Sequence, residues 1–310
     1  MNSIWTMGEI LVEIMRPEPG IGLSVPGAFV GPFPSGAPAI FIDVAARLGV
    51  STGIIGGVAD DVFGDLVVDR LKRDRVETRY IERFAGTTAV AFVAYDDAGD
   101  RTFVYHIEGT PAVRARFSPP EPAFQPGFFH VMGCSLMANG QFRHEIMSAA
   151  AWFGAAGAQI SFDPNIRQEL LHGRALGDVV GEEFLSSCSV VLPGEEELAA
   201  LAGTHDVGLG ATRLIAEYGL EYVVVKHGKS GATVFNERQS VKIPAHRVTE
   251  VDPTGAGDAF DAGFLAGLVH GYSPETAAEL AAWAGAQNAA AFGPMEGDIG
   301  IDRWAGDRES

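Results

Sequence analysis

The sequence predicts an α/β fold built on a mainly parallel central sheet. Two patterns in the chain lead to this prediction. Short apolar runs alternate with longer stretches of helical periodicity, as a layered α/β architecture requires. The apolar runs have few polar interruptions, which indicates strands that are buried on both faces of a parallel sheet. With 310 residues, of which 47% are hydrophobic and 20% are charged, the chain can bury a substantial core.

Six apolar runs are expected to form the strands of this sheet, and the stretches that follow them carry the helical pattern. The expected strands are Ile4–Met7, Thr52–Ile55, Phe128–Met132, Gln159–Asp163, Val190–Leu192 and Tyr222–Lys226. The expected helices are Pro38–Leu48, Asp65–Asp74, Gln141–Gly157, Glu195–Leu201, Gly208–Tyr218, Asp258–Val269 and Pro274–Phe292.

Two excursions interrupt this alternation and predict a small β lid. Ala89–Tyr95 and Thr102–His106 are strand-like, and the polar turn Asp96–Arg101 between them is typical of a hairpin. The Pro- and Gly-rich segment Arg16–Pro34 also has an extended pattern. We expect lid segments at about 14–34 and 87–110 over one edge of the main sheet, within a single domain that spans residues 1–310.

Composition limits the classes of partner. A net charge of −18 would repel a phosphate backbone, so nucleic acid is not an expected partner. No apolar run approaches the roughly 20 residues that span a bilayer, and the first residues lack the pattern of a signal peptide. Two distant cysteines, Cys134 and Cys188, argue against a disulfide scaffold and favour a reducing cytoplasm.

The most informative segment of the chain runs from Val251 to Phe260. The small residues Gly255, Ala256 and Gly257 leave their amides open to an anion, and the start of a helix adds its unpaired amides and positive dipole end. An acid at this point, Asp258, suits a base that takes a proton from a nucleophile attacking a phosphate. The alternative is an ordinary helix N-cap, which predicts no chemistry.

This segment carries a resemblance to a known family. The run Asp-Pro-Thr-Gly-Ala-Gly-Asp-Ala-Phe from Asp252 closely resembles the C-terminal signature of the ribokinase-like (PfkB) carbohydrate kinases, and the likeness extends from about Met7 to the C-terminal region. It implies a ribokinase-like three-layer fold and phosphorylation of a sugar hydroxyl by ATP with Mg²⁺. It makes Asp258 the general base and assigns the anion hole to Gly255, Ala256 and Gly257.

The resemblance also implies a site for a monovalent cation such as K⁺. Asp252 and Thr254 match the positions that hold this ion in the family. Turn stabilisation, with Asp252 accepting an Asx-type hydrogen bond, explains the two residues equally well.

The N-terminal signature of the family is only partly kept. Gly36 and Ala37 match it, and they imply contacts with the sugar, but Ile40 stands where the family has a sugar-binding Asn. Asp43, one turn further along the helix, could compensate, with a solvated helix Asp as the alternative. Glu13 lies where relatives present an Asp to sugar hydroxyls, with a water-facing strand residue as the alternative.

Further substrate contacts are implied at the end of the strand Gln159–Asp163. Asn165 could reach phosphate or substrate, and Arg167 an anionic group; both lie at a carboxyl-end loop, where α/β sheets place ligands. In 2-keto-3-deoxygluconate kinases a similar Arg binds the substrate carboxylate with a second Arg on the lid. That second position here is Ile107, near Tyr105 and Glu108, which favours a neutral sugar.

Nucleotide contacts are implied on three later segments. Gly194 replaces the Asn of the family's Asn-x-x-Glu element, whereas Glu197 keeps the acid. In the family this acid organises the phosphate and the Mg²⁺ ion, and it reaches the ion through water. The loop after Tyr222–Lys226 matches the nucleotide loop, and Trp283 and Asn288 lie on a helix that flanks the adenine in the family. Each assignment has an alternative. Lys226 could be an exposed lysine at a strand end, and the glutamates at the start of the helix Glu195–Leu201 could complement its dipole. Ala-rich packing could explain the helix that carries Trp283 and Asn288. The residues assigned to ATP are Asn165, Glu197, Lys226, Gly228, Gly231, Gly255, Gly257, Trp283 and Asn288.

Together these patterns predict an ATP-dependent kinase of a neutral sugar, with transfer to a primary hydroxyl of a ketohexose such as fructose or tagatose. The resemblance implies that two lids pair in a homodimer. The alternatives are a 2-keto-3-deoxygluconate kinase, a nucleoside kinase, or an inactive nucleotide-binding regulator. The sequence contains no Walker-type phosphate loop, zinc-spaced Cys/His cluster or nucleophile elbow.

Overall fold

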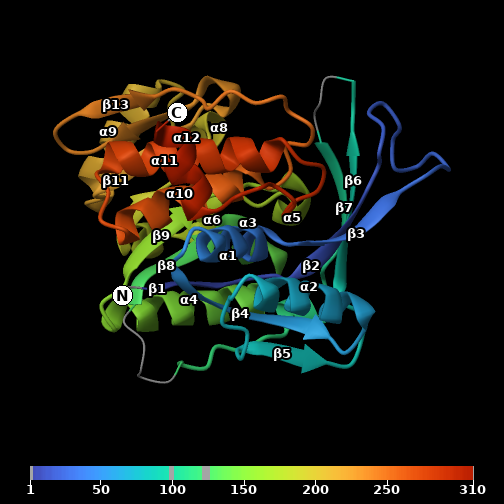
Figure 1. Ribbon diagram of the computed structural model, residues 1–310. Helices are drawn as coiled ribbons and strands as arrows, with labels where there is room; N and C mark the ends of the chain where they lie inside the picture. The colour runs from blue at the N-terminus through green and yellow to red at the C-terminus, as the bar shows by residue number, and fades with distance from the viewer. Residues whose placement is uncertain (1–2, 98–100, 121–125, 310) are drawn as a thin grey trace.

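The computed structural model, which describes residues 3–97, 101–120 and 126–309, contains a nine-stranded sheet. Its strand order is β13-β12-β11-β10-β9-β8-β1-β4-β5 (Figure 1). All neighbours pair in parallel except at one edge, where β12 pairs antiparallel with both β11 and β13. The strands are β1 (Ser3–Met7), β4 (Ser51–Ala59), β5 (Ile81–Phe84), β8 (Pro126–Met132), β9 (Gln159–Asp163), β10 (Cys188–Val191), β11 (Tyr222–Lys226), β12 (Ala232–Phe235) and β13 (Ser240–Ile243).

Helices cover both faces of this sheet. From β1 the chain adds β4 and β5 on one side, whereas β8 to β11 are added on the other, so right-handed crossovers place the two sets of helices on opposite faces. One face carries α1 (Ala37–Arg47), α2 (Val62–Arg73), α10 (Ala256–Val269) and α11 (Pro274–Ala289). The other carries α4 (Gly140–Ala155), α8 (Glu195–Ala202) and α9 (Val207–Tyr218). The predicted three-layer α/β fold is confirmed.

A second, four-stranded sheet projects from the main body and forms the lid (Figure 1). Its strand order is β3-β2-β6-β7, and β2 and β6 pair in parallel. β2 begins before the expected lid segment at about 14–34. Of the expected hairpin turn, residues 98–100 lie outside the described residues. The prediction of one domain over residues 1–310 stays a prediction. The lid strands are β2 (Leu11–Met15), β3 (Val30–Ser35), β6 (Ala89–Tyr95) and β7 (Arg101–His106).

The remaining helices are short or terminal. They are α3 (Gly133–Ala138), α5 (Gln168–Leu171), α6 (Leu176–Val180), α7 (Glu182–Leu185) and α12 (Ile301–Glu309). Across the described part of the chain, no helix combines the length and the apolar character that a membrane span needs.

A buried ion-pair cluster joins α1 to α2 and to the loop after α11. The Arg70 guanidinium contacts both carboxylate oxygens of Asp43, at 3.3 and 3.1 Å, and donates to the Met295 carbonyl at 2.6 Å. Asp74 and Glu296 complete its partners. Asp43 is fully buried and Arg70 is 7% exposed. Burial raises the pKa of Asp43 to about 7, against the opposing charge of Arg70.

We predict that Arg70→Met lowers the free energy of unfolding by about 3–5 kcal/mol, because it leaves the buried Asp43 carboxylate without its closest cation. Urea unfolding measures the change. Arg73→Met on the exposed side of the same helix is the matched control, with an expected change within about 0.5 kcal/mol. Equal effects of the two substitutions would contradict the assignment.

Candidate active site

A cavity lies where the strand order of the main sheet reverses. β1 has β4 on one side and β8 on the other, and α/β sheets bind ligands outside the carboxyl ends of strands at such a switch point. Glu9 follows β1 and Cys134 follows β8, and both line the cavity. Lid strands β2 and β7 and the first turn of α1 close its other sides. The cavity volume is about 40 Å³.

Asp258 lies at the floor of this cavity, in the first turn of α10. The helix begins at Ala256 with Gly255 as its N-cap, so Asp258 is the third helical residue and the N-cap alternative does not hold. Its carboxylate is 6% exposed, and the Asn165 side-chain amide donates to Oδ1 over 3.0 Å. Among the described residues no hydrogen bond reaches the second oxygen, Oδ2, so this oxygen can accept one from a substrate hydroxyl.

The electrostatic surroundings tune Asp258 as a base. Burial raises the pKa of Asp258 to about 6; the charges of Arg167 and Lys226 oppose this rise, and that of Asp163 adds to it. A general base works best when its pKa lies near the pH of the reaction. The carboxylate is therefore ionised at neutral pH and still basic enough to accept a proton.

The turn before α10 has the shape expected of an anion hole. Gly255 has a φ of 76°, and a Cβ there would lie 2.6 Å from the Pro294 carbonyl oxygen, so a larger side chain does not fit. The Gly257 and Asp258 amides lie in the first helical turn, where no helix carbonyl is available to them. The Ala256 amide donates weakly to the Pro253 carbonyl, at 3.3 Å. Gly255, Ala256 and Gly257 are thus brought together beside Asp258.

Asp252 and Thr254 hold this turn in place. Asp252 Oδ1 accepts the Thr254 amide at 3.0 Å, and Oδ2 accepts the Gly293 amide at 2.9 Å. Both side chains are buried. These are the contacts expected if Asp252 and Thr254 stabilise the turn, because the side chains form hydrogen bonds within the protein.

A buried charge network lies behind the base. Lys226 Nζ contacts Asp163 Oδ2 at 2.9 Å and Asp261 Oδ1 at 3.1 Å. Asp163 in turn accepts the backbone and side-chain amides of Asn165, which has a left-handed φ of 38°. Lys226 is thus not the exposed strand-end lysine of the alternative. Through Asp163 and Asn165 it fixes the orientation of Asp258.

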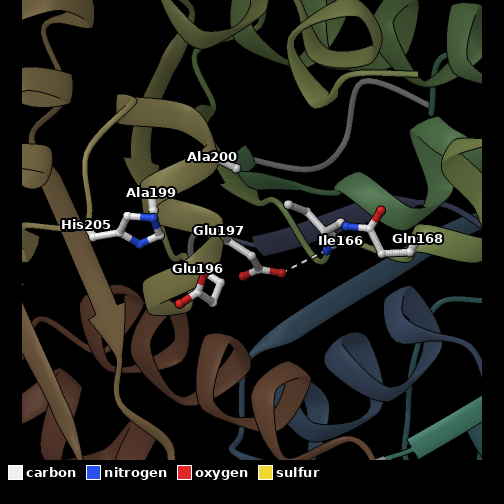
Figure 2. Close-up of a pocket in the computed structure, with 7 residues that line it drawn as sticks. All are labelled: Ile166, Gln168, Glu196, Glu197, Ala199, Ala200 and His205. Carbon is white, nitrogen blue, oxygen red and sulfur yellow. Dashed lines mark hydrogen bonds between the residues drawn. The ribbon is translucent and has the colours of Figure 1, made fainter. Parts of the chain in front are cut away.

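Glu197 joins two loops at the edge of a larger cavity (Figure 2). Its carboxylate accepts the Ile166 amide at 2.8 Å and the Gly194 amide at 2.7 Å. The cavity measures about 590 Å³ and includes Glu196 and His205, but it lies outside the cluster around Asp258. We place the candidate active site at the smaller cavity, because Asp258, Gly255 and the cations Arg101 and Arg167 all line it.

Of the remaining residues assigned to the nucleotide, some have an accessible backbone and others are needed for packing or hydrogen bonds within the protein. A Cβ at Gly228 would enter open space, which leaves its backbone accessible, whereas one at Gly231 would lie 2.1 Å from the Ile243 carbonyl oxygen. Gly231 is therefore required by strand packing. Asn288 donates to the Thr254 and Pro294 carbonyls and so braces the anion hole.

The position of Trp283 corrects the expectation that it flanks an adenine. Its side chain is 1% exposed, its indole N–H donates to Asp307 at 2.9 Å, and its ring packs 5.9 Å from that of Trp304. Trp283 is therefore buried in the core beneath α12, and its ring is not accessible to an adenine.

Most residues assigned to the sugar do meet at the cavity. Gly36, Ala37, Tyr105, Asn165 and Arg167 line it, together with Ile40 and Ile107. Glu13 lines it as well; it is 6% exposed, so the expected alternative of a water-facing strand residue is wrong. Ser35 Oγ donates to Glu13 Oε1 at 2.8 Å, and burial raises the pKa of Glu13 to about 7.

The position of Asp43 contradicts the expectation that it could supply the sugar contact missing at Ile40. It neither lines the cavity nor contacts solvent, because Arg70 and Arg47 hold its carboxylate in the interior. It therefore cannot compensate for the Ile40 position, and its alternative, a solvated helix residue, is wrong too.

Two charged residues at the cavity were missed by sequence reasoning. Glu9 is 4% exposed and accepts hydrogen bonds from Cys134 Sγ and Ser135 Oγ. Its place directly after β1 was a usable signal. Arg101, at the start of β7, lines the cavity too, so a second arginine is present after all, although not at Ile107. Glu108 is exposed and lies outside the cavity lining.

Comparison with known proteins agrees with this geometry. Residues 1–299 match the model of the pfkB family of carbohydrate kinases. The chain belongs to this family. The kinase is 34% identical over 284 residues to a fructokinase of Klebsiella pneumoniae, covering 90% of this chain and 89% of that protein.

Solved structures of relatives share the fold of the kinase. An Escherichia coli protein in complex with ATP and Mg²⁺ is 34% identical, with a TM-score of 0.91 over 100% of this chain and 99% of that one. A fructokinase of Vibrio cholerae O395 in the fructose-, ADP- and calcium-bound form is 26% identical, with a TM-score of 0.84 over 99% and 98%. The protein is therefore a sugar kinase that depends on ATP and a divalent metal.

We predict that Asp258→Asn lowers kcat by about 10²–10⁴, the usual contribution of a general base, and leaves the fold intact. Because Asp258 must be ionised, wild-type kcat/KM should fall tenfold per pH unit below about 6. Initial rates from pH 4.5 to 8.5, with circular dichroism as the control for folding, measure both effects. A flat profile across pH 6 would contradict the role of Asp258.

Proposed function

We propose that the kinase phosphorylates a primary hydroxyl of a neutral ketohexose, with fructose as the substrate. The observation that carries this proposal is a pair of oxygens in the cavity. Glu13 Oε2 and Asn165 Oδ1 are buried without a hydrogen-bond partner among the described residues. Buried acceptors of this kind need donors, and the hydroxyl groups of a polyol supply them. The similarity to fructokinases supports the choice of sugar.

The charge balance of the cavity favours a neutral substrate over a sugar acid. Arg101 and Arg167 face three carboxyl groups, those of Glu9, Glu13 and Asp258. The arginine charges act on these groups, because Arg101 lowers the pKa of Glu13 and Arg167 lowers that of Asp258, both against burial. The positive charge is thus compensated within the protein. A further carboxylate on the substrate would have no cation of its own.

Catalysis follows from the arrangement around Asp258. When the acceptor hydroxyl reaches Oδ2, Asp258 takes its proton while the oxygen attacks the γ-phosphorus of ATP. The bond from the γ-phosphorus to the bridging oxygen breaks, and ADP leaves. Asn165 holds the carboxylate in orientation, and the amides of the anion hole stabilise the charge on the transferring group. ATP supplies the phosphoryl group, and a divalent metal bound with it would offset the negative charge of the phosphates.

Glu197 and Glu196 provide oxygen donors of the type that Mg²⁺ accepts. Each Glu197 oxygen already accepts one backbone amide, which leaves a lone pair on each for a water ligand of the ion. We assign Glu197 to holding Mg²⁺ through water. The described residues contain no group of three or more His, Cys, Asp and Glu that could hold a metal ion by itself.

The fit to K⁺ is poorer. A fructokinase variant of Vibrio cholerae has been solved with fructose, ADP and a potassium ion. In the present chain, however, the Thr254 and Gly293 amides and the Tyr95 hydroxyl occupy about three of the roughly four lone-pair sites of Asp252. We therefore assign Asp252 and Thr254 to holding the turn and route no step through a monovalent cation.

An ADP-release assay tests the substrate. We expect kcat/KM for fructose to exceed that for 2-keto-3-deoxygluconate and for a nucleoside by at least about tenfold, a difference of about 1.4 kcal/mol in transition-state binding. Tagatose serves as the neutral comparison, and Asp258→Asn as the matched control for contaminating activity. Preference for the sugar acid would replace fructose with the first alternative. ATP binding without turnover of any sugar would favour the regulator.

We also propose a homodimer formed by the outer faces of two lids, in a reducing cytoplasm that suits two buried, free cysteines. Phe103 and Tyr105 of β7 face the cavity side, so Val104 between them points outward, where it is 54% exposed. Phe92 pairs with Val104 in the sheet, and Phe29 packs on Phe92 with ring centroids 6.0 Å apart. Such an apolar group on an exposed sheet face marks an interaction surface.

Light scattering during size-exclusion chromatography measures this association. Wild-type protein at micromolar concentration should elute as a dimer, and Val104→Lys as a monomer, because a buried interface does not tolerate an unpaired charge. Leu209→Lys, at a position that is 52% exposed on α9, is the matched control and should remain dimeric. A monomeric wild type would refute the lid interface.

A further inference from the structure

One side chain of the lid reaches beyond the sugar cavity to the turn before α10. Tyr95, the last residue of β6, donates its hydroxyl hydrogen to Asp252 Oδ1. The same hydroxyl oxygen lies 2.5 Å from Thr254 Oγ1. Because the single hydrogen of Tyr95 goes to the carboxylate, the Thr254 hydroxyl donates to the Tyr95 oxygen. A residue of the lid thus completes the hydrogen bonding of two residues in the main body.

Apolar packing holds Tyr95 at this position. It forms a cluster with Met15 and Val93 of the lid, against which Phe33 and Phe292 pack. The rings of Phe33, on the lid, and Phe292, on the loop after α11, lie 5.8 Å apart in an edge-to-face arrangement. The lid is therefore docked directly on this loop. Tyr95 is 9% exposed, so its hydrogen bonds are shielded from water.

Asp252 links Tyr95 to the turn that carries Gly255. Its carboxylate accepts the amides of Thr254 and Gly293, and so ties the turn to the loop after α11. Thr254 directly precedes Gly255, and Asn288 donates to the carbonyls of Thr254 and Pro294. Loss of the Tyr95 hydroxyl would leave the buried Asp252 carboxylate without one of its three donors.

We propose that Tyr95 is a positioning residue that couples lid closure to the geometry of the anion hole. Its hydroxyl fixes Asp252 and Thr254, and through them the amides of the turn at Gly255, only while the lid lies on the body. The proposal rests on the kinase reaction but not on the identity of the sugar. Burial and the charge of Asp252 raise the pKa of Tyr95, so the hydroxyl keeps its proton at neutral pH.

The lid strands give this contact a place in the catalytic cycle. Lid strands β2 and β7 line the sugar cavity, and β6 of the same sheet carries Tyr95. A movement of the lid that admits the sugar therefore separates Tyr95 from Asp252. When the lid returns, the contact re-forms, and the hole is complete only after the acceptor is enclosed.

The Tyr95→Phe substitution removes the hydroxyl and keeps the ring in its apolar cluster. We expect kcat to fall about tenfold and KM for the sugar to change less than about twofold, because the lost contact acts on transition-state stabilisation. Tyr222→Phe, whose ring packs on Phe264 away from the cavity, is the matched control with unchanged rates. A kcat within twofold of wild type would overturn the proposal.

A double-mutant cycle separates positioning from general stabilisation. If Tyr95 acts through Asp252, then Tyr95→Phe should slow an Asp252→Asn enzyme little further, whereas independent effects would multiply. Multiplicative effects would overturn the proposal.

Amide hydrogen exchange gives a readout that needs no turnover. The Thr254 and Gly293 amides should exchange faster in Tyr95→Phe than in wild type or Tyr222→Phe, because their acceptor Asp252 is less well held. Unchanged exchange would overturn the role of Tyr95. Inactivity of the wild type on fructose would instead count against the proposed substrate and leave this measurement valid.

Discussion

The burial of the Asp258 carboxylate is the constraint on which the rest of the active site depends. An ionised carboxylate in this position is costly unless cations and donors surround it. Arg167 and Lys226 supply positive charge, and Asn165 supplies a hydrogen bond on one oxygen. Arg167 and Asn165 follow β9 and Lys226 ends β11, so the shared carboxyl edge of parallel strands is what makes the arrangement possible. The result is a carboxylate whose pKa is raised to about 6 and which suits the role of base that we propose for it.

The same cavity shows how a pocket can recognise uncharged hydroxyl groups with charged side chains. Arginines and carboxyl groups nearly balance inside it, and the orphaned oxygens of Glu13 and Asn165 supply directional contacts. Ile40 adds an apolar wall to the cavity. Selectivity in such a site comes from unsatisfied polar atoms more than from net charge, because a wrong substrate leaves them unpaired.

Sequence reasoning could predict the parts of the site whose residues are adjacent in the chain or end a buried strand. Asp258 and Gly255 belong to one short motif, and Asn165 follows β9, so local patterns placed all three. Asp43 and Tyr95 could not be placed this way, because their partners, Arg70 and Asp252, lie far away in sequence. Burial of Asp43 has no signal in helical periodicity, since it depends on a cation from another helix.

The fold shows the same division. Continuous apolar runs identified the central strands β1, β8, β9 and β11, whereas β5 and β13, which lie at the sheet edges and are partly exposed, carry no such signal. The lid is the other case, since its central pair, β2 and β6, comes from two distant segments of the chain, and β2 begins before the segment expected from the sequence. A lone hairpin is marginal in water, so neither excursion would form this sheet alone. The lid is therefore no transferable module: in evolution it could not be gained or lost by a single insertion or deletion.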